Sequence, residues 1–224
     1  MSEPAYSNAG RPKDRNQPGR VLLYYITDRR QFPGTEAEQR RSVLRCMERA
    51  AGAGVDYIQV RERDLSAHDL EALAKEAVEL VRAVNPSTRL LVNSRVDVAL
   101  AAGADGVHLR SDDPLASEAR AIAAARPGFL IAVSCHTVAD VRSAWSHGAD
   151  FTVFGPVFEK YGIAGTLVEG LKEACSAAPG FVLALGGVTA ENARSCIQAG
   201  AAGIAGIRLF QGENLSGALC ELKR

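Results

Sequence analysis

The chain has 224 residues, of which 47% are hydrophobic, and this is enough for one large core in a single domain. Its 26 basic residues balance its 26 acidic residues, which excludes a general positive field that would attract nucleic acid or an anionic membrane surface. No run reaches the roughly 20 apolar residues of a membrane-spanning helix, and the N-terminus lacks the apolar centre of an export signal, so we expect a cytoplasmic protein.

The first 20 residues predict a disordered N-terminal tail, because they are rich in Pro, Gly, Asn and charge and poor in large apolar side chains. Over 21–224 the chain alternates short runs of branched apolar residues with longer segments of helical periodicity. This alternation is typical of successive strand and helix units around a parallel sheet. We therefore expect one α/β domain over 21–224.

Eight strands and eight helices are predicted in this domain. The strands cover 21–26, 55–60, 89–93, 105–109, 129–134, 150–154, 181–185 and 202–207. The helices cover 36–52, 66–84, 94–102, 114–126, 137–147, 167–177, 189–199 and 212–223. Eight units of each kind close a (β/α)8 TIM barrel. The alternative is an open doubly wound sheet, but that fold usually has a glycine-rich phosphate loop after its first strand, where this chain reads YYITDRRQFPG.

A weak internal repeat favours the barrel. The segments AGAGVDYI, AAGADGVHL, SHGADFTVF and QAGAAGIAG each place a helix-ending glycine directly before a strand. These glycines are Gly54, Gly103, Gly148 and Gly200. The residues expected to cap helix N-termini are Ser66, Thr137 and Thr189.

The five cysteines are expected to be buried free thiols in a reducing compartment. They are odd in number, widely spaced and mostly set among apolar neighbours, and no CxxC pair is present for zinc or redox chemistry. They are Cys46, Cys135, Cys175, Cys196 and Cys220.

Polar residues at the carboxyl ends of the strands form the candidate site, because TIM barrels place their chemistry there. The second strand ends in Gln59, Arg61 and Arg63, which alternate onto one face. Two guanidiniums in a barrel mouth favour an anionic or aromatic ligand. The alternative is that the arginines pair with local acids, namely Asp28, Glu62 and Asp64.

The next three strands end in polar residues that each allow two interpretations. Asn93 either hydrogen-bonds a ligand or caps the following helix. Of Asp112 and Asp113, helix capping accounts for one, and the other is free to bind Mg2+, which prefers carboxylate oxygens. His136 has the pKa range for proton transfer but is as often structural, whereas His108, inside a strand, is expected to be a hydrogen-bonded barrel residue.

Glycines after the last two strands give the strongest chemical signal. LGGVT at 185–189 and AGIR at 205–208 follow strands seven and eight. TIM barrels commonly bind phosphate there, because glycines let backbone N–H groups approach the oxygens and a helix N-terminus adds positive potential. The alternative is two tight turns that need glycine for backbone reasons alone.

Six segments match a known family in order and spacing over nearly all of 21–211: YYITDR, DYIQVRERDLS, LLVNSRVDVALAAGADGVHLRSDD, IAVSCHT, GADFTVFGPVF and LALGGVTAENARSCIQAGAAGIAGI. They resemble thiamine-phosphate synthase, and the related thiazole tautomerases share most of the same frame. The resemblance implies a TIM-barrel transferase that joins hydroxymethylpyrimidine diphosphate to a thiazole phosphate, with Mg2+ as the cofactor that holds the departing diphosphate.

The resemblance also implies which residues form the site. Pyrimidine and diphosphate contacts fall on Gln59, Arg61, Arg63, Asn93 and Ser134, and one metal ligand falls on Asp113. Thiazole-phosphate contacts fall on Gly187, Gly206, Ile207 and Arg208. The candidate catalytic residues are Arg61, Arg63, Ser134 and His136.

This chain departs from the family pattern in four places. Arg63 stands where the family usually has Lys, Ser94 where a second metal-binding Asp is expected, and Arg208 where a small hydroxyl residue is usual. The loop 159–165 replaces a Thr-rich stretch that carries a Lys, and Lys160 is a candidate substrate contact from a shifted position.

Three functions follow, all with small phosphorylated molecules as partners. The synthase is favoured because the pyrimidine-side set is nearly whole, whereas a tautomerase, with His136 moving the proton, is favoured by Ser94 and by the altered loop. The third is a barrel that binds thiazole phosphate without turnover, because a fold does not prove a chemistry. The sequence does not decide the oligomeric state, although barrels of this size often form homodimers.

Overall fold

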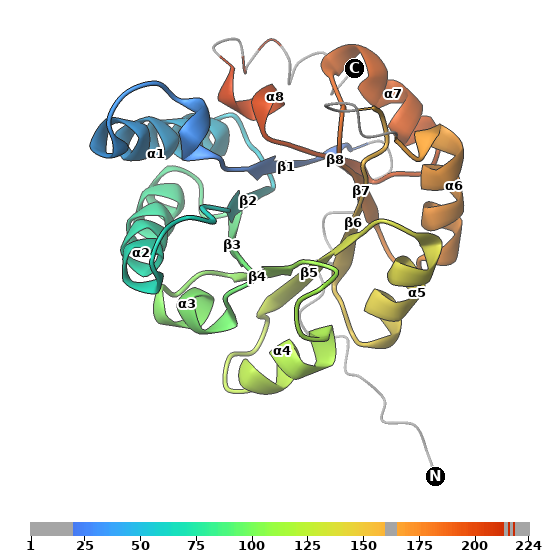
Figure 1. Cartoon of the computed structure of the whole chain (residues 1–224), viewed down its shortest axis with the longest axis horizontal. Helices are drawn as coiled ribbons and strands as arrows, with labels where there is room; N and C mark the ends of the chain where they lie inside the picture. The colour runs from blue at the N-terminus through green and yellow to red at the C-terminus, as the bar shows by residue number, and fades with distance from the viewer. Residues whose placement is uncertain (1–19, 160–164, 213–214, 216, 218–224) are drawn as a thin grey trace.

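The computed structural model describes residues 20–159, 165–212, 215 and 217, and these form a closed barrel of eight parallel strands in sequence order. The helices surround the strands, as the view in Figure 1 shows. The strands β1 to β8 are Leu22–Ile26, Tyr57–Val60, Arg89–Asn93, Gly106–Leu109, Leu130–Cys135, Phe151–Phe154, Val182–Ala184 and Gly203–Gly206. The (β/α)8 prediction is confirmed, and the open-sheet alternative is wrong because β1 pairs with β8.

The helices that follow these strands are amphipathic segments packed against the outside of the barrel. Helices α1 to α8 are Glu36–Gly52, Ala67–Val84, Val96–Ala101, Ala116–Ile122, Val138–Ser146, Leu167–Ala177, Ala190–Gln198 and Arg208–Gln211. A short 3-10 turn, η2, covers Arg29–Gln31. No helix in the described part of the chain is both long and apolar enough to cross a membrane.

Two predicted helices are shorter than expected, for local reasons. The segment 94–102 becomes helical only at Val96, because Ser94 has a φ of +60°, which no helical residue adopts. The segment 114–126 is helical only over Ala116–Ile122, and its helix follows a turn in which the backbone N–H of Arg110 donates to the Asp113 side chain.

A short helix that was not predicted, α8, follows β8 at once. It places Phe210 in the core, where this side chain is fully buried and its ring lies 5.8 Å from that of Tyr25 on β1. The helix over 212–223 stays a prediction. Most of 212–223 lies outside the described residues, as does the predicted tail apart from Arg20.

The internal repeat is a repeat of backbone conformation. The four glycines have φ values of +78°, +70°, +85° and +104°, the left-handed region that ends a helix at little cost only for glycine. At Gly103 and Gly148 a Cβ atom would meet nothing within 4 Å, so conformation rather than packing requires glycine there. The predicted caps Ser66, Thr137 and Thr189 are the N-cap residues of α2, α5 and α7.

Three of these glycines are followed two residues later by an aspartate that closes the amino end of the barrel. Each aspartate accepts a hydrogen bond from a backbone N–H of the preceding strand and pairs with an arginine. The sets are Asp56 with Leu23 and Arg20, Asp105 with Leu90 and Arg89, and Asp150 with Ile131 and Arg120, and the N–H bonds measure 3.0, 2.9 and 2.7 Å. These carboxylates therefore fasten neighbouring strands to each other.

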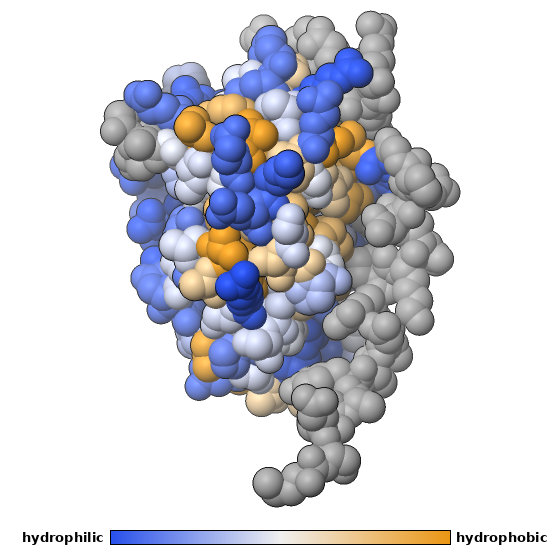
Figure 2. All heavy atoms as spheres, turned by 90° about the vertical axis from the view of Figure 1, so that its right-hand side faces the viewer, coloured by the Kyte–Doolittle hydropathy of each residue, from blue (hydrophilic) through white to orange (hydrophobic). Residues whose placement is uncertain are grey.

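The barrel interior is filled by aromatic rings. Tyr57 lies 4.9 Å from Phe151 between ring centroids, and Phe151 stacks on Phe181 at 5.0 Å. The interior is thus a packed core below the carboxyl end, and any substrate must bind above it. Outside the barrel, the face that carries α6 shows hydrophilic residues interspersed with separate hydrophobic areas (Figure 2).

The described cysteines are all free thiols, as predicted. Cys46, Cys135 and Cys196 are buried, whereas Cys175 is half-buried, so burial was predicted too strongly for that residue. Cys220 lies outside the described residues.

Candidate active site

The end of β2 places two arginines without counter-ions at the carboxyl end of the barrel. Gln59 is 2% exposed inside the barrel, Arg61 is half-buried, and Arg63 is exposed. No carboxylate of the described residues lies within 4 Å of the guanidinium of Arg61 or Arg63. An anionic ligand would supply the missing negative charge.

The acids nearest in sequence are held by a different arginine. The buried guanidinium of Arg29 lies 3.2 Å from Glu62 and 2.6 Å from Asp64. Glu62 also accepts a bond of 2.6 Å from Thr27. The interpretation in which Glu62 and Asp64 neutralise the arginines of β2 is therefore wrong, because Arg29 takes both.

The surroundings of Arg61 disfavour its positive charge. Burial lowers the pKa of its guanidinium, and the positive charges of Arg63 and Arg110 lower it further, against the opposing effect of Asp28 and Glu62. A bound anion would offset the repulsion that Arg63 and Arg110 exert on Arg61, and so raise the pKa of Arg61 again. The charges at the end of β2 therefore favour an anionic ligand.

Two amides connect β2 with β3 beside these arginines. Gln59 Nε2 donates to Asn93 Oδ1 at 2.8 Å, and Asn93 Nδ2 donates to Ser94 Oγ at 2.8 Å. Arg95, not Asn93, is the N-cap residue of α3, so the capping interpretation of Asn93 is wrong. The sequence-predicted Gln59 and Asn93 therefore lie together at the mouth, with Ser94 as their neighbour.

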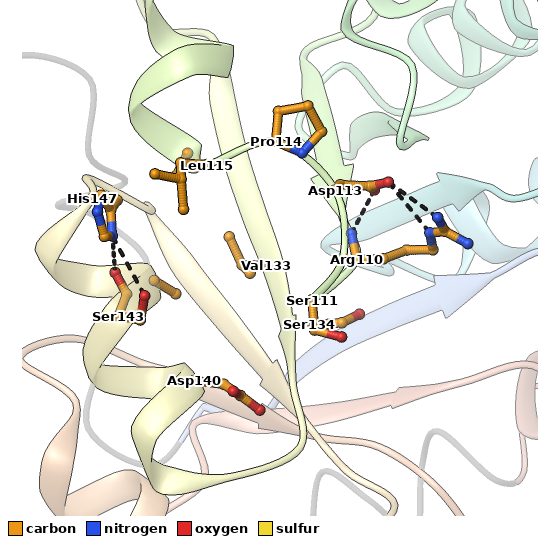
Figure 3. A pocket seen from close by; sticks show the side chains of 12 residues that line it. Arg110, Ser111, Asp113, Pro114, Leu115, Val133, Ser134, Asp140, Ser143 and His147 are labelled. Carbon is orange, nitrogen blue, oxygen red and sulfur yellow. Dashed lines mark hydrogen bonds and ion pairs between the residues drawn. The ribbon is translucent and has the colours of Figure 1, made fainter.

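The predicted metal ligand Asp113 is engaged by Arg110. Its Oδ2 accepts the backbone N–H of Arg110 at 2.7 Å, and its Oδ1 lies 3.3 Å from the guanidinium, as Figure 3 shows. Arg110 also pairs with Asp112 at 3.1 Å. Neither carboxylate caps α4, whose N-cap is Leu115, so that expectation is wrong.

The donor set at this place fits a divalent cation only as one ligand among several. No group of three or more His, Cys, Asp or Glu side chains with metal-binding geometry occurs in the described residues. Asp113 keeps carboxylate lone pairs for a cation, but Ser94 contributes no charge. A Mg2+ ion would have to take its other ligands from water and from substrate oxygens.

A small cavity of about 80 Å³ lies beside the mouth, between the loop after β4, strand β5 and helix α5 (Figure 3). Arg110, Asp113 and Ser134 line its inner side, and Leu115 and His147 lie farther out. Val133, which alternates with Ser134 along β5, also lines it, so the cavity extends outside the barrel. It adjoins the site without being the barrel mouth.

The polar residues of β4 and β5 are joined through the barrel interior. His108 is 2% exposed, and its Nε2 lies 2.8 Å from Ser134 Oγ while its Nδ1 lies 2.8 Å from the hydroxyl of Tyr24. Burial lowers the pKa of His108 to about 3, which keeps it neutral. The prediction of a hydrogen-bonded barrel histidine is confirmed.

His136 lies at the rim, where β5 ends. It is exposed, and its Nδ1 lies 2.5 Å from the carbonyl oxygen of Gly155. Because a carbonyl only accepts, Nδ1 carries the proton and Nε2 keeps a lone pair when the ring is neutral. Lys160, the other residue predicted near this rim, lies outside the described residues.

The loop after β7 offers backbone donors. Within the described residues, no hydrogen bond is made by the backbone N–H of Gly187, Val188 or Ile207. Gly187 has a φ of +65°, and a Cβ at Gly186 would lie 2.6 Å from Pro156 Cα, so backbone and packing also require these two glycines. The two interpretations of this loop are therefore compatible.

Gly206 differs from the glycines after β7. A Cβ there would meet Leu209 at 3.6 Å and nothing closer, and its φ is not in the left-handed region. Neither conformation nor packing explains glycine at this position, whereas close approach of a ligand would. Ile207 is partly buried beside it, and the exposed Arg208 begins α8.

Sequence reasoning missed Arg110 and Tyr24 as parts of the site. Arg110 follows His108 by two residues and could have been found from strand alternation. Tyr24 had no such signal, because its contact with His108 spans 84 residues and depends on closure of the barrel.

Comparison with known proteins gives one consistent result. The family model described as thiamine monophosphate synthase matches residues 23–210. A putative thiamine-phosphate synthase of Geobacter sulfurreducens is 41% identical over 187 residues, covering 82% of this chain and 83% of that protein. A thiamine-phosphate synthase of Roseiflexus castenholzii is 36% identical, covering 91% of this chain and 89% of that protein.

Solved structures agree with the fold. The thiamine phosphate pyrophosphorylase of Pyrococcus furiosus superposes with a TM-score of 0.77 and 30% identity, covering 92% of this chain and 95% of that one.

A probable thiamine biosynthetic bifunctional enzyme of Oryza sativa is 34% identical in sequence, but the chain spans only 36% of its length. The similarity to that enzyme thus concerns one part of it.

Proposed function

Because the chain belongs to the thiamine monophosphate synthase family, we propose that it is a transferase that joins hydroxymethylpyrimidine diphosphate to thiazole phosphate and releases diphosphate. The observation that carries this proposal is the pair of arginines without counter-ions at the end of β2, next to the Gln59–Asn93 amide pair. In the reaction, the bond between the pyrimidine methylene carbon and the diphosphate oxygen breaks, and a bond from the thiazole nitrogen to that carbon forms.

On the pyrimidine side, the amides of Gln59 and Asn93 would orient the ring, and Ser134 would add a further polar contact. Arg61 and Arg63 would bind the diphosphate and stabilise the negative charge that grows on it as it leaves. The lowered pKa of Arg61 supports this assignment, since the penalty behind it is relieved when an anion binds.

On the thiazole side, the phosphate would bind to the free backbone N–H groups of Gly187 and Ile207. Gly206 would leave room for close approach, and Arg208 would add a positive charge at the rim. The unexplained absence of a side chain at Gly206 is the strongest support for this half of the site. Lys160 stays a prediction for the same substrates.

Mg2+ would be held by Asp113, together with water and diphosphate oxygens, and would neutralise part of the charge on the leaving group when bound. Arg110 competes for the same carboxylate, at 3.3 Å. Asp113 would therefore offer a bound cation only the carboxylate lone pairs that Arg110 does not take.

The test is product formation from the two substrates, with and without Mg2+, followed by chromatography. Thiamine phosphate that depends on Mg2+ supports the synthase. No change in either substrate, combined with binding of the thiazole phosphate, would contradict it and leave a binding protein.

A thiazole tautomerase is the second candidate, because Gly155 fixes the proton of His136 on Nδ1 and leaves Nε2 to act as a base. In the same assay, it would convert carboxylated thiazole phosphate into its isomer without joining the substrates. His136→Asn would then abolish isomerisation, whereas a synthase would keep most of its activity.

A further inference from the structure

A chain of three hydrogen-bonding side chains crosses the barrel interior and ends at the site. The hydroxyl of Tyr24 on β1 lies 2.8 Å from Nδ1 of His108 on β4, and Nε2 of His108 lies 2.8 Å from Oγ of Ser134 on β5. Tyr24 is fully buried, His108 is 2% exposed, and Ser134 is partly exposed at the mouth. The chain thus runs from the closed core to the open end.

The Tyr24 hydroxyl decides which ring nitrogen of His108 carries the proton. His108 is neutral, so one ring nitrogen donates and the other accepts. Within the described residues, the Tyr24 hydroxyl makes no hydrogen bond except that to His108, and the rings of Tyr57 and Phe151 pack around it. If Nδ1 carried the proton, the Tyr24 O–H would be a buried donor without an acceptor, which is strongly unfavourable.

The favourable arrangement therefore has the Tyr24 O–H donating to Nδ1, and Nε2–H donating to Ser134 Oγ. The Ser134 oxygen then accepts from inside the barrel, and its own hydrogen has to point elsewhere. No acceptor for that hydrogen is present among the described residues.

We propose that Tyr24 and His108 are positioning residues that make the Ser134 hydroxyl a hydrogen-bond donor toward the substrate. The inference rests on the proposed function for the identity of that substrate. The group that Ser134 would recognise is an acceptor, either an unprotonated pyrimidine ring nitrogen or a diphosphate oxygen. A donor group presented at the same place would be rejected.

The first test reads the tautomer directly by 15N NMR on protein labelled at its four histidines, with His108→Gln to assign the signals. We expect His108 to carry its proton on Nε2 and to show no titration between pH 6 and pH 8. A proton on Nδ1, or a charged ring in this range, would overturn the proposal. This result does not depend on whether the enzyme turns over.

The second test is a double-mutant cycle of Tyr24→Phe and Ser134→Ala. Ser134→Ala should lower kcat/KM for the pyrimidine diphosphate about 100-fold. Tyr24→Phe should lower it about 10-fold, and the double variant should be no worse than Ser134→Ala. Additive losses would overturn the proposal, because Tyr24 would then act without Ser134.

Tyr25→Phe is the matched control, since that buried tyrosine lies on the same strand but faces the helices and not the barrel interior. It should leave both kinetic constants unchanged. The KM for thiazole phosphate should stay unchanged in Tyr24→Phe as well, which a general loss of fold would not allow.

Calorimetric titration with inorganic diphosphate and with hydroxymethylpyrimidine, each added to wild type and to Ser134→Ala, identifies the acceptor. Weaker binding of one of the two shows which group takes the hydrogen bond. If neither binds more weakly, the donor role of Ser134 is wrong. If wild type forms no thiamine phosphate, the proposed function fails. The tautomer measurement then still decides whether Tyr24 and His108 orient the Ser134 hydroxyl.

Discussion

The two ends of the barrel differ in whether their charged residues have partners of opposite charge. At the amino end, Asp56, Asp105 and Asp150 each accept a backbone N–H and pair with an arginine. At the carboxyl end, Arg61 and Arg63 have no carboxylate within ion-pairing distance in the described part of the chain. Both ends are built from the same strands, so this contrast is a property of the side chains and not of the fold.

The contrast separates stability from function. Carboxylates whose hydrogen bonds are satisfied fasten strands together, whereas a half-buried cation without a partner, such as Arg61, costs stability unless a ligand joins it. A TIM barrel uses its carboxyl end for chemistry, and the surplus positive charge there agrees with that division. Substitutions at the two ends should therefore affect different measurements.

The largest expected effect comes from Arg61→Met. Turnover should fall about 1,000-fold or more, because a half-buried donor to the departing diphosphate is lost. The melting temperature should stay equal or rise, since a cation that burial and Arg63 destabilise is removed. Steady-state kinetics and thermal unfolding measure the two quantities, and a large loss of stability would show that Arg61 is structural.

The opposite result is expected at the amino end for Asp150→Ala. Its carboxylate accepts bonds of 2.7 Å from both Ile131 N and Arg120, so its removal should cost about 2–3 kcal/mol of unfolding free energy while kcat stays unchanged. Urea unfolding measures this. Asp97→Ala, which removes a largely exposed partner of Arg95, is the control and should cost well under 1 kcal/mol.

A third prediction concerns acid stability through His108. Its pKa is about 3 in the folded protein, below the ordinary value of 6.5, so the unfolded chain binds a proton that the folded chain does not. Stability should therefore fall as pH drops from about 6.5 toward 3, by about 1.4 kcal/mol per pH unit from this residue alone.

Comparing urea unfolding of wild type and His108→Asn at pH 7 and pH 5 measures this dependence. The variant should lose the part of the slope that His108 supplies. His68→Asn, at an exposed histidine outside the barrel, is the control substitution for the exchange of an imidazole for an amide. Equal slopes in wild type and His108→Asn would contradict the low pKa.

The smallest expected effect is that of Gly206→Ala. A Cβ at this position has room, with its nearest neighbour at 3.6 Å, so the melting temperature should not fall. The KM for thiazole phosphate should nevertheless rise about 10-fold, or about 1.4 kcal/mol, if the phosphate approaches the backbone there. Gly212→Ala, with similar room at 3.7 Å, should change neither quantity, and an unchanged KM in Gly206→Ala would remove the phosphate from this turn.

The sequence predicted the barrel because its signals are local. Strand and helix periods, and glycines such as Gly103 that end helices, depend only on nearby residues. Helix α8, which was not predicted, shows the limit, since it forms where Phe210 packs against Tyr25, far away in the chain. Such a contact has no local signature.

The sequence indicated which strand ends carry the candidate site residues, but not which partners these residues have. Gln59 and Asn93 were expected at the mouth, and they lie there in contact. That Arg29 would take Glu62 and Asp64, and that Arg110 would hold Asp113, depended on the geometry of loops from different strands. Ion pairing decides which charges are left for a ligand, and it requires the folded structure.

The proposed function requires that Arg61 at the carboxyl end holds the diphosphate. Calorimetric titration of inorganic diphosphate into wild type, Arg61→Met and Arg120→Met is the decisive test, because Arg120 is the matching cation at the amino end. We predict one binding site in wild type and in Arg120→Met, and none detectable in Arg61→Met. Equal affinity in all three proteins would contradict the claim and place the anion site elsewhere.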